Sequence, residues 1–159
     1  MCQAEDGQTG RGRVEEGPMA KTQPLSKPQY ETLAAFRHAL RQFLHFSEQA
    51  ALAAGVTPQQ HQALLAIKGY PGRDRVTVGE LAERLLLRHH SAVGLVDRLV
   101  AEKLAARECA EEDRRRVFVK LTRRGEEILE ALSSLHRRQL RQTGPDLSVL
   151  LQRLADPDV

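Results

Sequence analysis

The stretch from Val76 to Thr122 constrains the fold most strongly, because the period of its hydrophobic pattern changes partway along it. In its first half, apolar residues recur at the three- and four-residue steps of an amphipathic helix. After Leu104, apolar and polar residues alternate instead, which is the period of a strand with one buried face. We therefore predict a helix, a turn, a second helix and then a two-stranded ribbon, with the rest of the chain supporting this unit.

The first predicted helix begins at Thr77. Thr77 and Glu80 have the spacing of a capping box, in which the Thr hydroxyl accepts a hydrogen bond from a backbone N–H of the first turn and the Glu side chain reaches back to the cap. The pattern predicts a short helix that is buried on one side. Its expected apolar face consists of Leu81, Ala82, Leu85 and Leu86.

The second predicted helix follows a polar interruption, Arg88–Ser91. Two helices joined by a tight turn form a helix-turn-helix. The apolar residues of this second helix again have helical spacing: Ala92, Val93, Leu95, Val96, Leu99 and Val100.

A β-hairpin is predicted after the second helix. Residues Leu104–Cys109 form a segment short enough to pair antiparallel with the alternating segment Arg115–Leu121, and Ala110–Arg114 would form the charged tip. Val76 is placed to add a short third strand. A helix-turn-helix followed by such a hairpin is the winged-helix arrangement, whose second helix enters the DNA major groove while the hairpin reaches toward the minor groove. The sequence thus predicts a DNA-binding protein of mainly α class.

A tail and a long helix are predicted at the N-terminal end. Residues 1–28 contain several Gly and Pro and few large apolar side chains, so we expect a disordered tail. From Tyr30 to Ala53 apolar residues recur at helical steps, which predicts a long amphipathic helix. Gly55 is a suitable stop for it.

Further helix boundaries come from capping residues and breakers. Thr57–Gln60 has the capping-box pattern for a helix that runs to Lys68, and Thr122 is the expected cap of a long C-terminal helix. We predict that Gly144 and Pro145 end this long helix and that a last short helix follows. Long helices at both ends of the chain are expected to pack together.

Charge and composition agree with one soluble domain of 159 residues. Between Arg73 and Arg124 there are 13 Lys or Arg and 9 Asp or Glu, so the net positive charge of the chain, +3 overall, lies in the predicted DNA-binding unit. Hydrophobic residues make up 41% of the chain, and none of their runs is long enough to span a membrane. Cys2 and Cys109 have neither a disulfide-framework nor a metal-binding spacing, which fits a reducing cytoplasm.

Several short motifs resemble those of the MarR family of winged helix-turn-helix transcriptional regulators. The resemblance runs from about Tyr30 to the C-terminus, and its most specific part is the wing signature between Asp113 and Gly125. Two positions depart from the family pattern, since Lys103 stands where a Gly is usual and Ala110 where an Asp is common. The motifs are Leu81–Leu85, Val96–Leu99, Leu104–Arg107, Asp113–Arg115 and Val119–Thr122 with Gly125.

The resemblance implies a single domain over residues 29–159. It consists of a winged helix-turn-helix at about 57–122 and dimerisation helices at about 30–53 and 122–156. The implied function is that of a homodimer that binds double-stranded DNA at a pseudo-palindromic operator, as a repressor. The resemblance further implies a small, often aromatic or phenolic, effector that binds between the dimer helices and the reading unit. The sequence identifies neither the effector nor its pocket.

The candidate DNA-binding residues lie at the start of the second helix and in the wing. The first turns of a helix in the major groove are nearest the base edges, and an Arg there can address guanine with two hydrogen bonds. Arg98 is expected to reach a phosphate or to brace the wing, and Asp113 is expected to hold Arg115 extended by an ion pair. The candidates are Arg88, His89, His90, Ser91, Arg98, Asp113, Arg114, Arg115 and Arg116.

Simpler interpretations stand beside these assignments. His89 and His90 also fit a solvated turn, and the charged hairpin fits an exposed surface of little energetic value. Cys109 would act as a redox switch if Arg107 stabilised its thiolate, although a single cysteine of this kind is more often inert. A protein-interaction module without DNA binding is the other alternative. No motif for catalysis, for a cofactor or for a metal site is present.

Overall fold

The computed structural model describes residues 24–109 and 117–156. These residues form five helices and one three-stranded antiparallel sheet, so the predicted mainly helical fold with a small β wing is confirmed. The elements follow one another as α1 (Lys27–Ala53), α2 (Pro58–Lys68), β1 (Arg75–Thr77), α3 (Val78–Arg84), α4 (His89–Ala101), β2 (Ala105–Cys109), β3 (Val117–Leu121) and α5 (Arg123–Ala155).

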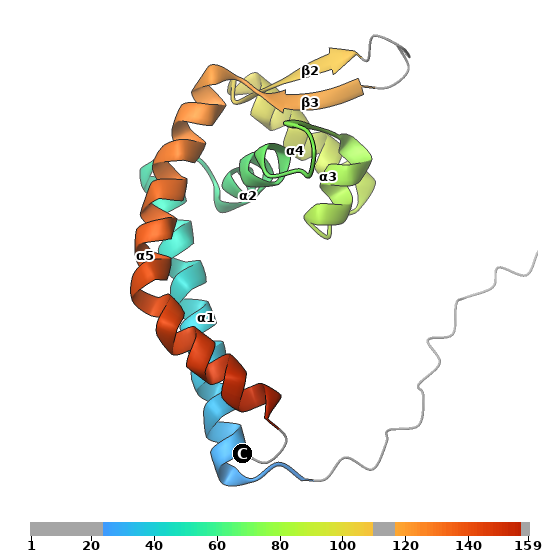
Figure 1. Cartoon of the computed structure of the whole chain (residues 1–159). Coiled ribbons are helices and arrows are strands. Elements are labelled where there is room, and N and C mark those ends of the chain that lie inside the picture. The colour runs from blue at the N-terminus through green and yellow to red at the C-terminus, as the bar shows by residue number, and fades with distance from the viewer. Residues whose placement is uncertain (1–23, 110–116, 157–159) are drawn as a thin grey trace, which may run out of the picture.

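The long helices α1 and α5 pack side by side, as expected, and extend away from a compact unit made of α2, α3, α4 and the sheet (Figure 1). They run antiparallel, because Leu25, just before α1, and Leu33, near its start, line the same small hollow as Leu154 at the end of α5. No helix in the described ranges combines the length and the hydrophobicity needed to cross a membrane.

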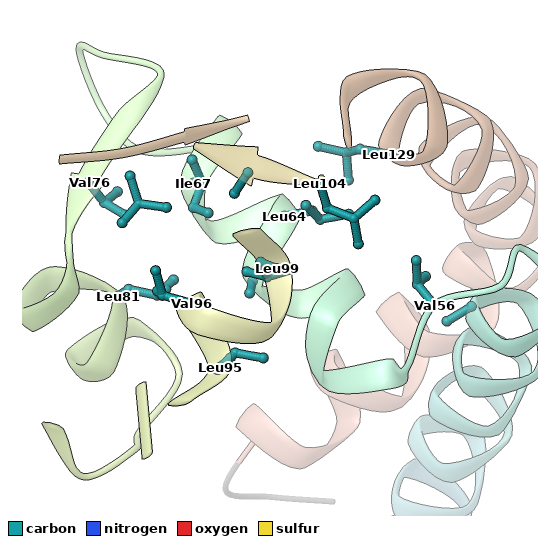
Figure 2. Close-up of a cluster of buried hydrophobic side chains, with 14 of the residues drawn as sticks. Val56, Leu64, Ile67, Val76, Leu81, Leu95, Val96, Leu99, Leu104 and Leu129 are labelled. Atoms are coloured by element: carbon teal, nitrogen blue, oxygen red, sulfur yellow. The ribbon is translucent and has the colours of Figure 1, made fainter. Parts of the chain in front are cut away.

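A single hydrophobic core holds the compact unit together. Side chains from α2, α3, α4, the sheet and the start of α5 point toward one another (Figure 2). Leu95, Val96 and Leu99 on α4 and Leu81 on α3 are at most 1% exposed, so the two helices of the helix-turn-helix are seated on this core. Their opposite faces are turned outward.

The sheet has the strand order β1-β3-β2, with β3 in the centre. Val76 lies opposite Val119, and both side chains are fully buried on the face that covers the core. The short third strand predicted at Val76 is therefore confirmed. Leu104, which was predicted to begin the hairpin, instead lies just before β2, where its backbone carbonyl accepts a hydrogen bond from the Thr122 amide.

Side-chain caps begin four of the five described helices. The predicted caps Thr57, Thr77 and Thr122 are confirmed, and each Thr hydroxyl accepts a hydrogen bond from a backbone N–H of its first turn. Ser26 caps α1 in the same way, together with Gln29. Because of this cap, α1 begins at Lys27, three residues before the Tyr30 start that hydrophobic spacing predicted. The first 23 residues of the predicted tail lie outside the described ranges.

Helices α1, α3 and α4 end in the same Schellman geometry. In each, a residue with positive φ is followed by one whose N–H returns five residues to a carbonyl of the last turn, as Leu87 does to Ala82 and Leu104 does to Leu99. Gly55 has the positive φ at the end of α1, as predicted, but Leu86 and Lys103 have it in the other two helices. Placing Leu86 on the buried face of α3 was therefore wrong.

Helix α5 continues through Pro145, and the predicted break at Gly144 and Pro145 was wrong. A proline inside a helix removes one backbone hydrogen bond and costs about 3 kcal/mol. Here α5 packs against α1, and beyond Pro145 its Leu154 still lines a hollow shared with Leu33 of α1. Tertiary packing therefore outweighs the local preference to stop.

Candidate DNA-binding surface

The start of α4 is exposed and has no side-chain cap. Arg88 is its N-cap residue, and the Arg88 side chain makes no hydrogen bond to the first turn. Arg88, His89 and His90 are all exposed, whereas Ser91 is half-buried. The N–H groups at a helix start attract anions, and the helix dipole adds to this attraction. The first turn of α4 therefore combines a positive helix end with an arginine and two histidines.

Arg98 lies two turns further along the exposed side of α4. A Cβ atom built on Gly94 would meet the Arg98 Nη1 at 3.6 Å, so this guanidinium folds back over Gly94 toward the start of the helix. The glycine leaves an open surface for it. Arg88 and Arg98 thus both lie on the outward side of α4, as a DNA-reading helix requires.

An ion pair joins α4 to the wing. The Arg107 Nη2 on β2 donates to the Asp97 Oδ1 on α4 at 2.7 Å. Arg98 was a candidate to brace the wing, but Asp97, the residue before it, makes this contact. The alternative of a redox switch at Cys109 required Arg107 to stabilise its thiolate, and the Arg107 guanidinium is engaged by Asp97. Cys109 is exposed at the end of β2, and a redox role for it stays a prediction.

The strands β2 and β3 carry the wing loop. Asp113, Arg114, Arg115 and Arg116 lie in the segment 110–116, outside the described residues, so their predicted DNA contacts and the Asp113 to Arg115 ion pair stay predictions. The hairpin that presents them is confirmed, since β2 and β3 pair in register from Ala105 opposite Leu121 to Cys109 opposite Val117.

A charge network crosses the outer face of the sheet. Glu108 on β2 accepts hydrogen bonds from Lys120 on β3 at 2.6 Å and from Arg75 on β1 at 3.1 Å. Lys120 first, and then Arg75, lower the pKa of the Glu108 carboxyl below its usual value. The network links all three strands where the hairpin leaves the body of the protein.

A second feature that the sequence did not reveal is a stacked histidine pair between α2 and α5. The rings of His61 and His136 are stacked with centroids 4.9 Å apart, and Phe43 and Phe46 of α1 meet His136 edge-on. Burial, and then the neighbouring His136, lower the pKa of His61. These histidines come from distant parts of the chain, and only the packing of α1, α2 and α5 brings them together.

The pair borders a cavity of about 350 Å³, which is lined mainly by apolar groups of α1, α2 and α5. The Nδ1 atom of His136 hydrogen-bonds the Leu132 carbonyl at 2.5 Å, whereas its Nε2 atom is buried and has no partner within the described part of the chain. The cavity therefore offers aromatic and aliphatic surface with a few polar atoms, which is the usual composition of a small-molecule site.

A model of the MarR family matches residues 54–116, from the end of α1 through the helix-turn-helix and into the wing. The matched segment contains α2, α3, α4 and β2, which are the elements that build the outward-facing surface described above. The matched segment therefore belongs to the MarR family, whose members are DNA-binding transcription regulators and not enzymes.

Solved structures of MarR proteins share this fold. AbsC, a MarR family transcriptional regulator from Streptomyces coelicolor, is 24% identical, with 79% of this chain and 84% of that chain covered and a TM-score of 0.65. A mutant of S. aureus MepR bound to an oligodeoxyribonucleotide is 22% identical, with 79% and 97% covered and a TM-score of 0.60.

A third structure concerns the regulation of DNA binding of Bordetella bronchiseptica BpsR by 6-hydroxynicotinic acid. It is 21% identical, with 79% of this chain and 99% of that chain covered and a TM-score of 0.56. No curated protein sequence is significantly similar to this chain. At these identities the structural likeness supports the fold, while the family model carries the assignment to MarR.

Proposed function

We propose that this MarR protein is a homodimeric, ligand-responsive repressor that binds a pseudo-palindromic operator. Two copies of α4 would enter successive major grooves about 34 Å apart, as in other helix-turn-helix dimers. The observation that carries the DNA-binding part is the exposed, uncapped and basic first turn of α4, which lies on the same unit as the wing. Arg88, His89, His90 and Ser91 would contact bases or phosphates there.

The other DNA contacts that we propose are made by Arg98 and by the wing. Arg98 is expected to reach a phosphate from the exposed side of α4, and Arg114, Arg115 and Arg116 are expected to reach the backbone or the minor groove. Phosphate contacts of this kind position the protein, whereas base contacts specify the sequence. MepR, which shares the fold, is described in complex with DNA.

The homodimer part of the proposal is supported by apolar side chains on the paired helices α1 and α5. In a lone chain these side chains face water, and a second copy would cover them. A two-fold dimer uses the same patch on both copies, so one apolar stripe is sufficient. The exposed large apolar residues of α1 and α5 are Tyr30, Leu33, Leu40, Leu44, Leu52, Leu140, Val149, Leu151 and Leu154.

The ligand-responsive part of the proposal is supported by the cavity beside His61 and His136. This cavity lies where the dimerisation helices meet α2 of the reading unit, and its lining suits a small aromatic molecule. BpsR, whose DNA binding is regulated by 6-hydroxynicotinic acid, has the same fold. A ligand in this position would change DNA affinity if it favoured one separation of the two α4 helices over another.

The test measures binding of the purified protein to the duplex DNA upstream of its own gene at several salt concentrations, with Arg88→Ala, Arg115→Ala and Arg138→Ala as variants. Each phosphate contact that is removed should lower the salt slope by about one unit. We expect Arg88→Ala and Arg115→Ala to weaken binding by roughly tenfold or more. Arg138, an exposed arginine of α5, is the matched control and should leave binding unchanged.

Other outcomes would favour the alternatives. Binding to neither this DNA nor randomised DNA would point to a protein-interaction module. An oxidant effect on DNA affinity that Cys109→Ser abolishes would point to a redox-sensing regulator. Equal losses in all three arginine variants would mean that net charge, rather than the α4 and wing surface, determines binding.

A further inference from the structure

Phe118 is buried although it lies on the outer face of the wing sheet. Val119 faces the core, so its neighbour Phe118 on β3 points to the opposite side, where a sheet of this size meets solvent. The alternation in the sequence accordingly places Phe118 with the polar set. In the structure it is only 5% exposed. Something on the outer face must therefore cover it.

Two arginine side chains provide part of this cover. The guanidinium carbon of Arg75 on β1 lies 4.6 Å from the Phe118 ring centroid, and that of Arg73 lies 5.3 Å from it. Arg73 also lies 4.6 Å from the ring centroid of Tyr70, and Arg84 of α3 lies 4.6 Å from the same ring. These five residues alternate cation and ring, and we call them the arginine–aromatic ladder: Arg84, Tyr70, Arg73, Phe118 and Arg75.

Arg73 is the central member of this ladder and is held from several sides. Its guanidinium contacts two rings, and its Nη2 also forms an ion pair with Glu80 of α3. Its Nε atom is buried without a hydrogen-bond partner among the described residues, so stacking and the Glu80 contact define its position. A guanidinium that stacks on rings and pairs with a carboxylate has few other orientations open to it.

Glu80 ties this contact to the start of α3. The same carboxylate accepts a hydrogen bond from the Thr77 amide at 2.8 Å as the second half of the capping box. Burial alone would raise the pKa of Glu80, but the Thr77 and Arg73 hydrogen bonds outweigh it and keep the pKa below its usual value. The Glu80 carboxylate is therefore charged near neutral pH and can bind both the Thr77 amide and Arg73.

The ladder connects the helix-turn-helix to the outer face of the wing sheet, and its Tyr70 also packs against the hydrophobic core. Arg84 belongs to α3, Phe118 and Arg75 belong to the wing strands, and Tyr70 and Arg73 lie in the connection between α2 and β1. The buried core residues of the sheet, Val76, Ala105 and Val119, all lie on its inner face. Contacts on both faces of a sheet resist a tilt that contacts on one face would permit.

We propose that the arginine–aromatic ladder sets the angle of the wing relative to α3 and α4, so that the wing and the start of α4 reach DNA together. Its members are positioning residues of the DNA-binding surface, and their effect on DNA rests on the proposed function. Isolated surface ion pairs would not have this effect, because they are weak and allow many geometries. A guanidinium between two rings is directional and shields Phe118 from water.

The first test measures the wing angle without DNA. Spin labels are placed on Cys109 at the end of β2 and on an introduced cysteine, Glu83→Cys, in a Cys2→Ser background. Glu83 is exposed on α3. Pulsed electron paramagnetic resonance on dimers that contain one labelled and one cysteine-free chain reports the distribution of this one distance. Tyr70→Leu removes the ring but keeps an apolar side chain, whereas Tyr70→Phe keeps the ring.

We expect Tyr70→Leu to widen the distance distribution about twofold and Tyr70→Phe to leave it unchanged, at equal helix content by circular dichroism. Equal widths in the two variants would overturn the proposal, whether both distributions stay narrow or both widen, because the ring would then not be the cause.

The second test follows the consequence on DNA by footprinting. Tyr70→Leu should lose minor-groove protection at the wing and bind roughly tenfold more weakly, while protection of guanine N7 in the major groove persists. Uniform loss of both protections would mean a general structural defect and would count against the ladder. Failure of the wild-type protein to bind any DNA would refute the proposed function, and the label distances would still decide whether the ladder sets the wing angle.

Discussion

Leu86 and Lys103 adopt left-handed backbone conformations although both have a Cβ atom. Their φ angles are 54° and 58°, and each residue closes a Schellman motif at the end of a helix of the helix-turn-helix. This conformation costs an L residue roughly 1 to 2 kcal/mol, and glycine avoids the cost. Gly55 adopts the same left-handed conformation at the end of α1 without this cost. The helix-turn-helix therefore contains two positions at which a glycine is compatible with the backbone.

Replacing Leu86 by Gly should stabilise the protein. Leu86 is 94% exposed, so its side chain contributes little burial that the substitution would remove. Relief of strain, less the greater freedom of glycine in the unfolded chain, should leave a gain of about 0.5 to 1 kcal/mol. Urea unfolding measures this gain. Leu86→Ala is the control, because it removes the side chain but keeps Cβ. A gain in Leu86→Ala as large as that in Leu86→Gly would show that backbone strain is not the cause.

At the scale of elements, the start of α5 is packed against the end of α4. The Thr122 hydroxyl donates to the Lys103 carbonyl at 2.6 Å, and the Thr122 amide donates to the Leu104 carbonyl at 3.1 Å. Gly125 follows in the first turn of α5, where a Cβ atom would lie 2.1 Å from the Leu104 oxygen. The wing signature thus ends in a glycine because two backbones approach each other there.

Replacing Gly125 by Ala should destabilise the protein by about 3 kcal/mol or more, because a methyl group would overlap a buried backbone carbonyl. The loss should appear as a lower urea midpoint. Gly144→Ala in the same helix is the matched control, since nothing lies within 4 Å of its added Cβ. That change should stabilise α5 by about 0.5 to 1 kcal/mol. Similar effects of the two substitutions would contradict the close approach at Leu104.

The contact between α2 and α5 should depend on pH through His61. Its folded pKa lies below the unfolded value of 6.5, because burial, and then His136, disfavour the charged ring. The neutral ring therefore contributes stability above pH 6.5 that is lost as the pH falls through the folded pKa. We expect the wild type to lose more unfolding free energy between pH 7.5 and 5 than His61→Leu. Parallel losses in the two proteins would show that folding does not lower the pKa of His61.

At the scale of the whole molecule, the paired helices α1 and α5 connect the DNA-binding unit to the proposed dimer interface. One end of the pair supports the DNA-binding unit, and the rest of the pair extends away from it (Figure 1). Large apolar side chains of both helices face solvent. An exposed apolar stripe on two paired helices is the surface that a second copy would cover. The proposed dimer would then set the distance between the two copies of α4.

Replacing Leu151 by Glu should weaken the proposed dimer by about a hundredfold, since a two-fold interface contains the added carboxylate twice and each desolvated charge costs about 1.4 kcal/mol or more. Light scattering after size exclusion, at a series of concentrations, measures the effect. Leu65→Glu on α2 is the control, because Leu65 is 52% exposed and Leu151 is 51% exposed. A monomeric wild type, or equal weakening by both variants, would contradict the proposed interface.

Local patterns were sufficient to predict most of the fold. The capping boxes at Thr57 and Thr77 confine their interactions to four consecutive residues, so the sequence alone reveals them. The change of hydrophobic period after Leu104 predicted the hairpin for the same reason. The break at Pro145 was predicted wrongly, because a local preference was outweighed by packing between helices about a hundred residues apart in the sequence.

The features of the candidate site likewise divide into those that local sequence patterns predicted and those that depend on packing between elements. The sequence by itself determined the helix-turn-helix, the wing and the residues at the start of α4, because neighbours in the chain decide helix caps and strand alternation. Only the tertiary structure brought His61 to His136, Asp97 to Arg107, and Arg73 between Tyr70 and Phe118. These contacts depend on how α1, α2, α5 and the strands pack, and no spacing in the sequence encodes a distance between separate elements.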